Sequence, residues 1–258
     1  MGSVSTKIGT EYECEVKPGT KYAFYVLSTE GVEENKKVNL IMDRNICNDG
    51  TIPTSDKPCL YAWHWQIQEY DDSDNRYGPD IAMTNLYNGT KGWTNVPDMI
   101  MDYYDEGNKK DPTYGYESII TDEITKVTTI TGQGKESNYQ TFGDITNPLK
   151  ARLPKEYEVL TLCTISNGSC PMWLVKNLYY DSALNSYCNY CLSEYSENQS
   201  NGITNIYGYW LLSSGARSPY GASSVHCHGN VVFNFHTSYV SENGIRPVIT
   251  VPISYLTD

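Results

Sequence analysis

The distribution of apolar residues predicts β-strands at both ends of the chain. Residues 22–27 (YAFYVL) are aromatic and β-branched, which favours a strand. Residues 37–42 (KVNLIM) alternate polar and apolar side chains, as a half-buried strand does. Residues 244–251 (GIRPVITV) are strand-like near the C-terminal end. Because the first and last of these strands are both strongly hydrophobic, we expect them to pair and to bring the chain ends together.

Three helices are predicted from their start and stop signals. The Pro-Asp pair at 79–80 suits the first turn of a helix over residues 81–87, and the Asn-Gly pair at 88–89 is expected to end it. The second and third helices are expected over residues 156–162 and 171–178, the third with a proline at its first position.

The order of these elements predicts one α+β domain over residues 21–258, with two or three helices and a twisted, mostly antiparallel sheet. Residues 1–20 are polar and are expected to be peripheral. Residues 102–147 are rich in Gly, Asp, Thr and Tyr, and a Thr/Ile/Val run at 119–130 predicts a hairpin. From residue 207 onward, short strand signals alternate with Gly, Ser and Asn turns.

Composition narrows the class of protein. A hydrophobic content of 39% with 19% charged residues is typical of a folded chain rather than a disordered one. The net charge of −12 argues against binding to nucleic-acid phosphates, which requires a basic face. No run approaches the roughly 20 apolar residues of a membrane span, and no signal peptide is visible. The opening Met-Gly-Ser resembles the start of a recombinant product, so we expect any membrane anchor or secretion signal to lie upstream of this sequence.

The eight cysteines favour an oxidising, extracellular setting. Cys47 and Cys59 flank a polar loop, as do Cys163 and Cys170, and each pair is expected to form a disulfide that closes its loop. A four-cysteine zinc site is the alternative, but it needs a second CxxC beside the one at residues 188–191. The remaining cysteines, to which no partner is assigned, are Cys14, Cys188, Cys191 and Cys227.

The most unusual composition lies in residues 211–241. These 31 residues contain no Trp, Gln, Met, Lys or Glu, although those five types account for 46 of the 258 residues. Three of the four His and two of the four Phe fall in the same window. Exposed hairpins avoid Lys, Glu and Met to some extent for structural reasons, yet the clustering of His and Phe indicates a recognition surface.

Two motifs resemble those of a known fold group. The stretch RLPKEYE (152–158) resembles the R-L-P-x-E-x-E motif of formylglycine-generating-enzyme-like C-type lectin folds, and YWLLSS (209–214) followed by GIRPV (244–248) resembles their closing strands. The stretches DRNIC (43–47) and GPDIAM (78–83) extend the similarity to bacterial surface or pilin-associated C-type-lectin-like proteins. The resemblance covers about residues 20–255 and implies a C-type-lectin-like fold.

The resemblance also implies an origin for the unusual window. Some proteins of this group are diversified by retroelements that copy template adenines with errors into the end of the gene. An Asn codon randomised at its two adenines cannot yield Trp, Gln, Met, Lys or Glu, the types missing from residues 211–241. The implied design is a rigid platform of closing strands whose outward side chains vary without disturbing the core.

Side chains are assigned to the two faces of this platform on that basis. Aromatic, Arg and His side chains supply much of the energy in recognition patches. The positions expected to point inward are Trp210, Ala222, Val225, Val231, Ile245 and Val248. Those expected to point outward and bind the ligand are Arg217, Ser218, Tyr220, Ser224, His226, His228, Val232, Phe233, Phe235, His236, Ser238 and Tyr239.

Other chemistries have weaker support. His226 and His228 with Cys227 and His236 could hold a transition metal, but no carboxylate follows nearby, so no metal or cofactor is expected. Formylglycine-type chemistry needs a reactive cysteine pair near the C-terminus, where only Cys227 lies, and we expect no enzymatic activity. The Glu-Pro-Asn and Trp-Asn-Asp motifs of calcium-dependent sugar binding are both missing.

The sequence therefore predicts a cell-surface or pilus-associated adhesin that binds a protein or glycan on another cell or phage through residues 211–241. No nucleic acid is expected as a partner, and membrane contact is expected only through an upstream anchor or through pilus assembly. A structural pilus or cell-envelope subunit is the alternative, and an enzyme derived from the formylglycine-generating scaffold is a third interpretation.

Overall fold

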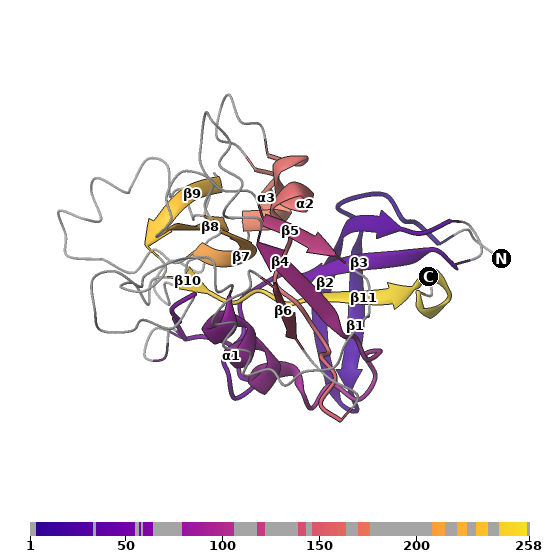
Figure 1. Cartoon of the computed structure of the whole chain (residues 1–258). Helices are drawn as coiled ribbons and strands as arrows, with labels where there is room; N and C mark the ends of the chain where they lie inside the picture. The colour runs from indigo at the N-terminus through magenta and orange to yellow at the C-terminus, as the bar shows by residue number, and fades with distance from the viewer. Residues whose placement is uncertain are drawn as a thin grey trace.

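The fold combines three β-sheets with three helices in the part of the chain described by the computed structural model (Figure 1). It is therefore an α+β protein, as the order of the sequence signals predicts. The described residues are 4–32, 35–54, 57, 59–63, 79–105, 118–121, 139–142, 146–163, 170–175, 208–214, 221–225, 231–236 and 243–256.

The first sheet contains both N-terminal strands that the sequence predicts. Its order is β1 (Glu11–Lys17), β2 (Thr20–Glu30), β3 (Lys37–Met42) and β11 (Val248–Pro252), with every neighbouring pair antiparallel. The predicted strands at 22–27 and 37–42 are confirmed as parts of β2 and β3.

The polar stretch 1–20 contains β1, an edge strand hydrogen-bonded to β2; its four charged side chains are exposed and its Val16 is fully buried. The partner expected for the last strand was wrong. The last strand, β11, pairs with β3 rather than with β2, the first predicted strand. Hydrophobicity shows that a strand is buried, but it does not show which neighbour the strand takes.

The second sheet contains the closing hairpins. Its order is β10 (Asn243–Gly244), β7 (Gly208–Ser214), β8 (Gly221–Val225) and β9 (Val231–His236). The β10–β7 pair is parallel, whereas β7–β8 and β8–β9 are antiparallel. A third sheet has the order β5 (Ser118–Thr121), β4 (Met101–Asp105) and β6 (Tyr139–Phe142). The hairpin predicted at 119–130 lies mostly outside the described residues, and its described part pairs with β4.

The three predicted helices are present with different lengths. The first, α1 (Asp80–Thr90), begins after Pro79 as expected but continues through Gly89. The second, α2 (Glu156–Leu160), and the third, α3 (Met172–Val175), begin within one residue of their predicted starts. A final 3-10 turn, η4 (Ile253–Tyr255), follows β11. No helix in the described part of the chain is long and apolar enough to span a membrane.

Gly89 lies inside the helix and against the neighbouring disulfide loop. A Cβ atom at this position would be 2.3 Å from the carbonyl oxygen of Cys47, so a larger residue has no room there. Its role is therefore close packing of α1 on the loop, whereas the sequence pattern predicted a helix end.

Two hydrophobic cores enclose the central strands. One contains Trp63, Trp93 and the buried face of α1, and the other contains residues of α2 and α3. Successive residues of β2 alternate between them, since Phe24 and Val26 belong to the first core and Tyr25 and Leu27 to the second. Figure 1 shows α1 on one side of the strands and α2 with α3 on the other. Strands enclosed on both faces have nearly continuous apolar sequences.

Candidate recognition surface

β7 is the anchor of the C-terminal sheet because both of its faces are buried. Tyr209 and Leu211 pack in the core beside α2 and α3, whereas Trp210 and Leu212 pack in the core beside α1. All four side chains are fully buried. The strand that begins the predicted recognition segment is therefore fixed from both sides.

Residues 59–63, which begin at the second cysteine of the Cys47–Cys59 pair, hold β7 and β10 in place. The indole Nε1 of Trp210 donates to the carbonyl oxygen of Tyr61 at 2.7 Å, and the Nε1 of Trp63 donates to the carbonyl oxygen of Leu211 at 2.8 Å. The amide of Tyr61 donates to the carbonyl oxygen of Asn243 at 3.0 Å. The strand and helix signals did not predict a role for residues 59–63, although the aromatic run YAWHW that begins at residue 61 is typical of a buried segment.

The burial of residues on β8, the next strand along the chain, confirms two side chains predicted to point inward and contradicts one predicted to point outward. Ala222 and Val225 are fully buried, as predicted, and so are Trp210, Ile245 and Val248. Ser224, expected on the binding face, is also fully buried, and its Oγ has no hydrogen-bond partner among the residues that the structure describes. The prediction assumed that one face of β8 is open to solvent, but both faces are covered here.

A side-chain hydrogen bond ties β8 to α2. The hydroxyl of Ser223 donates to Oε2 of Glu156 at 2.5 Å. Burial raises the pKa of the Glu156 carboxyl, and the hydrogen bond from Ser223 offsets part of this effect. The pairing register of β8 is irregular both with β7 and with β9, as at a β-bulge.

Four of the predicted contact residues lie on β9. In its register with β8, Phe235 is opposite Ala222, Val232 is opposite Ser224, and His236 is opposite Gly221. Phe233 lies on the same strand, as does Val231, which was expected to point inward. Among the described strands, β9 is the edge of the sheet. The other predicted contact residues, which lie outside the described residues, are Arg217, Ser218, Tyr220, His226, His228, Ser238 and Tyr239.

Most residues of the RLPKEYE motif lie in the interior of the protein. Arg152 makes a two-pronged ion pair with Glu158, with its Nη1 2.8 Å from Oε2 and its Nη2 2.7 Å from Oε1. Burial alone would raise the pKa of Glu158, but the charge and hydrogen bonds of Arg152 outweigh it and hold the pKa below its usual value. The backbone amide of Lys155 and the hydroxyl of Ser28 also donate to this carboxylate. In this protein, the motif therefore has a structural role.

A second buried cation joins the last strands to α3. The guanidinium of Arg246 lies over the ring of Tyr209, with Cζ 4.8 Å from the ring centroid. Its Nη1 donates to the carbonyl oxygen of Leu174 at 2.5 Å and its Nη2 to that of Asp43 at 2.7 Å. One side chain thus connects the segment between β10 and β11 with β7, α3 and the end of β3.

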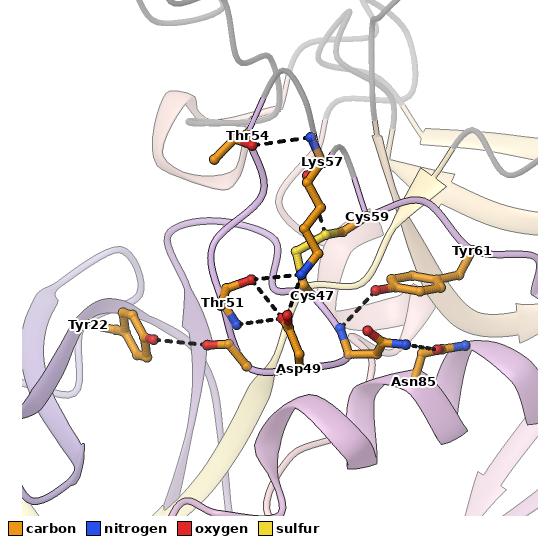
Figure 2. The surroundings of a disulfide bond; sticks show 11 residues. Tyr22, Cys47, Asp49, Thr51, Thr54, Lys57, Cys59, Tyr61 and Asn85 are labelled. Carbon is orange, nitrogen blue, oxygen red and sulfur yellow. Dashed lines mark hydrogen bonds and ion pairs between the residues drawn. A yellow bond between two sulfur atoms is a disulfide. The ribbon is translucent and has the colours of Figure 1, made fainter.

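Both predicted disulfides are present. Cys47 pairs with Cys59, and Cys163 pairs with Cys170. Figure 2 shows the first bond and its loop, in which the ammonium of Lys57 contacts the carboxylate of Asp49, and the hydroxyl of Tyr61 accepts a hydrogen bond from the backbone amide of Asn48. The loop is also connected to α1, since the Asn48 side chain donates to Oδ1 of Asn85 at 3.2 Å.

The remaining described cysteine is not a reactive thiol. Cys14, on β1, is free of disulfides and partly buried, and burial raises its pKa to about 11. Such a thiol is neutral near pH 7 and is a poor nucleophile and metal ligand. Within the described residues, no group of three or more His, Cys, Asp or Glu side chains could hold a metal ion.

Comparison with known proteins identifies no relative: no protein-family model, curated protein or solved structure matches this chain.

Proposed function

We propose that this chain is a cell-surface or pilus-associated ligand-binding protein with a C-type-lectin-like fold, and that residues 211–241 form its recognition surface. The observation that carries the proposal is the coincidence of two features. The window without Trp, Gln, Met, Lys and Glu starts within β7, which is buried on both faces, and includes all of β8 and β9. A rigid scaffold that carries a compositionally unusual segment is the arrangement that variable binding surfaces require.

Binding at this surface is reversible and involves no covalent chemistry. Within the window, the aromatic residues of β9 together with Arg217 and Tyr220 are of the types that dominate recognition patches, and His226 and His228 add polar groups that can donate or accept hydrogen bonds. The ligand is a protein or glycan on another cell or on a phage. The two disulfides support an extracytoplasmic location, because such bonds persist in oxidising compartments. Variation within 211–241 changes the partner.

The direct test replaces His226, Phe233 and Phe235 together by Ala. Labelled protein is applied to a glycan array and to a panel of intact bacterial cells and phage particles. We expect wild-type protein to bind at least one probe, and the triple variant to lose at least tenfold in affinity with a melting temperature lowered by only a few degrees. Unfolding of the variant would show that these residues belong to the core and would overturn the proposal.

A matched control removes exposed apolar side chains from other parts of the surface. Val32, Tyr157 and Tyr255 are 75%, 58% and 60% exposed and lie outside the window. Their simultaneous replacement by Ala should leave binding to the same probe unchanged. Equal loss of binding in both triple variants would show that binding is not specific to residues 211–241.

The alternative function is a structural pilus or envelope subunit, in which the aromatic C-terminal segment packs on a neighbouring subunit. Sequences from close strains distinguish the two functions. A recognition surface tolerates wholesale change within 211–241, whereas a subunit contact does not. At the gene level, a near-copy of the codons for 211–241 beside a reverse transcriptase gene supports diversification, and its absence contradicts that part of the proposal.

A further inference from the structure

The outer edge of the short strand β10 and its continuation is covered by two separate pieces of chain. Ile46 forms an antiparallel bridge with Ile245, and its amide donates to the Ile245 carbonyl oxygen at 3.0 Å. Tyr61 forms an antiparallel bridge with Asn243, two residues earlier along the same strand. The two pieces therefore lie one after the other along residues 243–245.

The Cys47–Cys59 disulfide connects these two pieces covalently. Cys47 directly follows Ile46, and Cys59 lies two residues before Tyr61, with a Cα–Cα distance of 5.1 Å across the bond. Cys47 is fully buried and Cys59 is 9% exposed, so the crosslink lies inside the structure. Figure 2 shows the crosslink close to Tyr61 and to α1.

The second piece also holds β7 through the two indole hydrogen bonds of Trp210 and Trp63. Both of these donors are fully buried side chains, and both acceptors are backbone carbonyl oxygens. A displacement of residues 59–63 would leave the Trp210 donor without its acceptor and the Leu211 carbonyl without its donor, which is costly inside a protein. The position of the second piece and that of β7 are therefore coupled.

We infer that the Cys47–Cys59 disulfide is the positioning element of the C-terminal sheet, in addition to closing its own loop. The disulfide joins residues 46–47 to residues 59–61, and these two pieces together form the edge against which β10 lies, called here the composite edge. The disulfide therefore fixes the composite edge, and through Trp63 and Trp210 it also fixes β7. Its consequence for ligand binding rests on the proposed function, because the recognition segment 211–241 begins within β7. The structural coupling itself needs no ligand.

The second disulfide provides a matched control. Cys163–Cys170 connects the end of α2 with the residues before α3 and packs against the core that contains Tyr209 and Leu211. The carbonyl oxygen of Leu174 in α3 accepts hydrogen bonds from the side chains of Tyr209 and Arg246, but no backbone hydrogen bond or bridge joins residues 161–163 or 170–175 to β7 or β10 among the described residues. Its removal costs loop-closure entropy, as does removal of the first disulfide, but it leaves the composite edge unchanged.

The test compares the double variants Cys47→Ser/Cys59→Ser and Cys163→Ser/Cys170→Ser by hydrogen–deuterium exchange with mass spectrometry. We expect the first variant to exchange at least tenfold faster than wild type in peptides covering 208–214 and 243–247. The second should differ from wild type by less than threefold in those peptides, and β1–β2 should be unchanged in both. Equal effects in the two variants, or uniform acceleration over the whole chain, would overturn the inference.

If the first variant does not fold, hydrogen–deuterium exchange of the wild-type protein in low concentrations of denaturant tests the inference instead. The inference requires the amide of Tyr61, which donates to the carbonyl oxygen of Asn243, to open in the same cooperative unit as β7 and residues 243–245. Opening of the Tyr61 amide at least tenfold faster than β7 would contradict it. A wild-type protein that binds no probe on the array or cell panel would overturn the proposed function, but it would leave these exchange results and their conclusion intact.

Discussion

Arg152 and Glu158 form a two-pronged ion pair in the interior, with side chains 4% and 0% exposed. Glu156, two residues earlier, is partly buried, and the hydroxyl of Ser223 is its hydrogen-bond partner. The two carboxyl pKa values shift in opposite directions: that of Glu158 is lowered and that of Glu156 is raised. These two neighbouring carboxyl groups therefore have opposite effects on the pH dependence of stability.

The first prediction concerns this pair of carboxyl groups. Glu158 stabilises the fold above its unfolded pKa, and this stabilisation is lost as pH falls through the lower, folded pKa. Glu158→Gln should lower the free energy of unfolding at pH 7 by about 3–5 kcal/mol, because it leaves the Arg152 charge buried and uncompensated. It should also flatten the acid limb of the stability profile, measured by urea denaturation from pH 3 to pH 8.

Glu156→Gln is the matched control for that measurement. The folded pKa of Glu156 lies above the unfolded value, so its contribution to stability falls as pH rises through the window between them. The Gln oxygen still accepts from Ser223 and carries no charge to desolvate. We expect the free energy of unfolding at pH 7 to change by less than about 1 kcal/mol. Equal losses in the two variants would contradict the assigned pKa directions.

The second prediction concerns the contact between α1 and the disulfide loop. Ala is a better helix former than Gly, yet Gly89→Ala should lower the free energy of unfolding by about 1–3 kcal/mol, because the new methyl group overlaps the Cys47 carbonyl oxygen. Gly92→Ala, where nothing lies within 4 Å of the added Cβ, should change it by less than about 0.5 kcal/mol. Thermal denaturation of both variants would test this, and a stabilised Gly89→Ala protein would disprove the close contact.

The third prediction separates two adjacent serines on β8. Ser224→Ala removes a buried hydroxyl without a partner and should raise the free energy of unfolding by up to about 1 kcal/mol. Ser223→Ala removes the donor to the partly buried Glu156 carboxyl and should lower the free energy of unfolding by about 1–3 kcal/mol. Chemical denaturation measures both values. A loss of ligand binding in a stable Ser224→Ala variant would show that this residue contacts the ligand.

The fourth prediction concerns the thiol of Cys14. With a pKa of about 11, only about one thiol in a thousand is ionised at pH 8. Alkylation of Cys14 by iodoacetamide in the folded protein should therefore be about two orders of magnitude slower than that of an exposed thiol. Peptide mapping by mass spectrometry follows this one residue, and the urea-unfolded protein is the control. Equal rates in the two states would contradict its burial.

The sequence predicted the elements of this fold better than their partners. The residue pattern of 37–42 matches β3 throughout its length, and both loop-flanking cysteine pairs are disulfides. The pairing of β11 with β3 and the strand at 11–17 were missed, because partner choice depends on register and burial across distant segments. The end of α1 was misplaced, because the Asn-Gly pair at 88–89 lies within the helix and Gly89 is required there by its close approach to the Cys47 carbonyl oxygen.

The candidate surface was predicted in part, for a related physical reason. Alternation along a strand distinguishes two faces but does not show whether both are covered, and Ser224 was therefore placed outside. The support that the segment 59–63 gives to β7 depends on backbone carbonyl acceptors, which leave no trace in side-chain composition. The contact residues on β9 and those outside the described residues stay predictions.

Residues 243–252 contribute one strand to the second sheet and, a few positions later, one strand to the first. Hairpins such as β2–β3 and β7–β8 can form as soon as the ribosome releases them, but neither of these two sheets gains its last described strand until residues 243–252 have emerged. Completion of both sheets therefore depends on the same short stretch of chain, and each partly assembled sheet leaves a strand edge open until that stretch is in place.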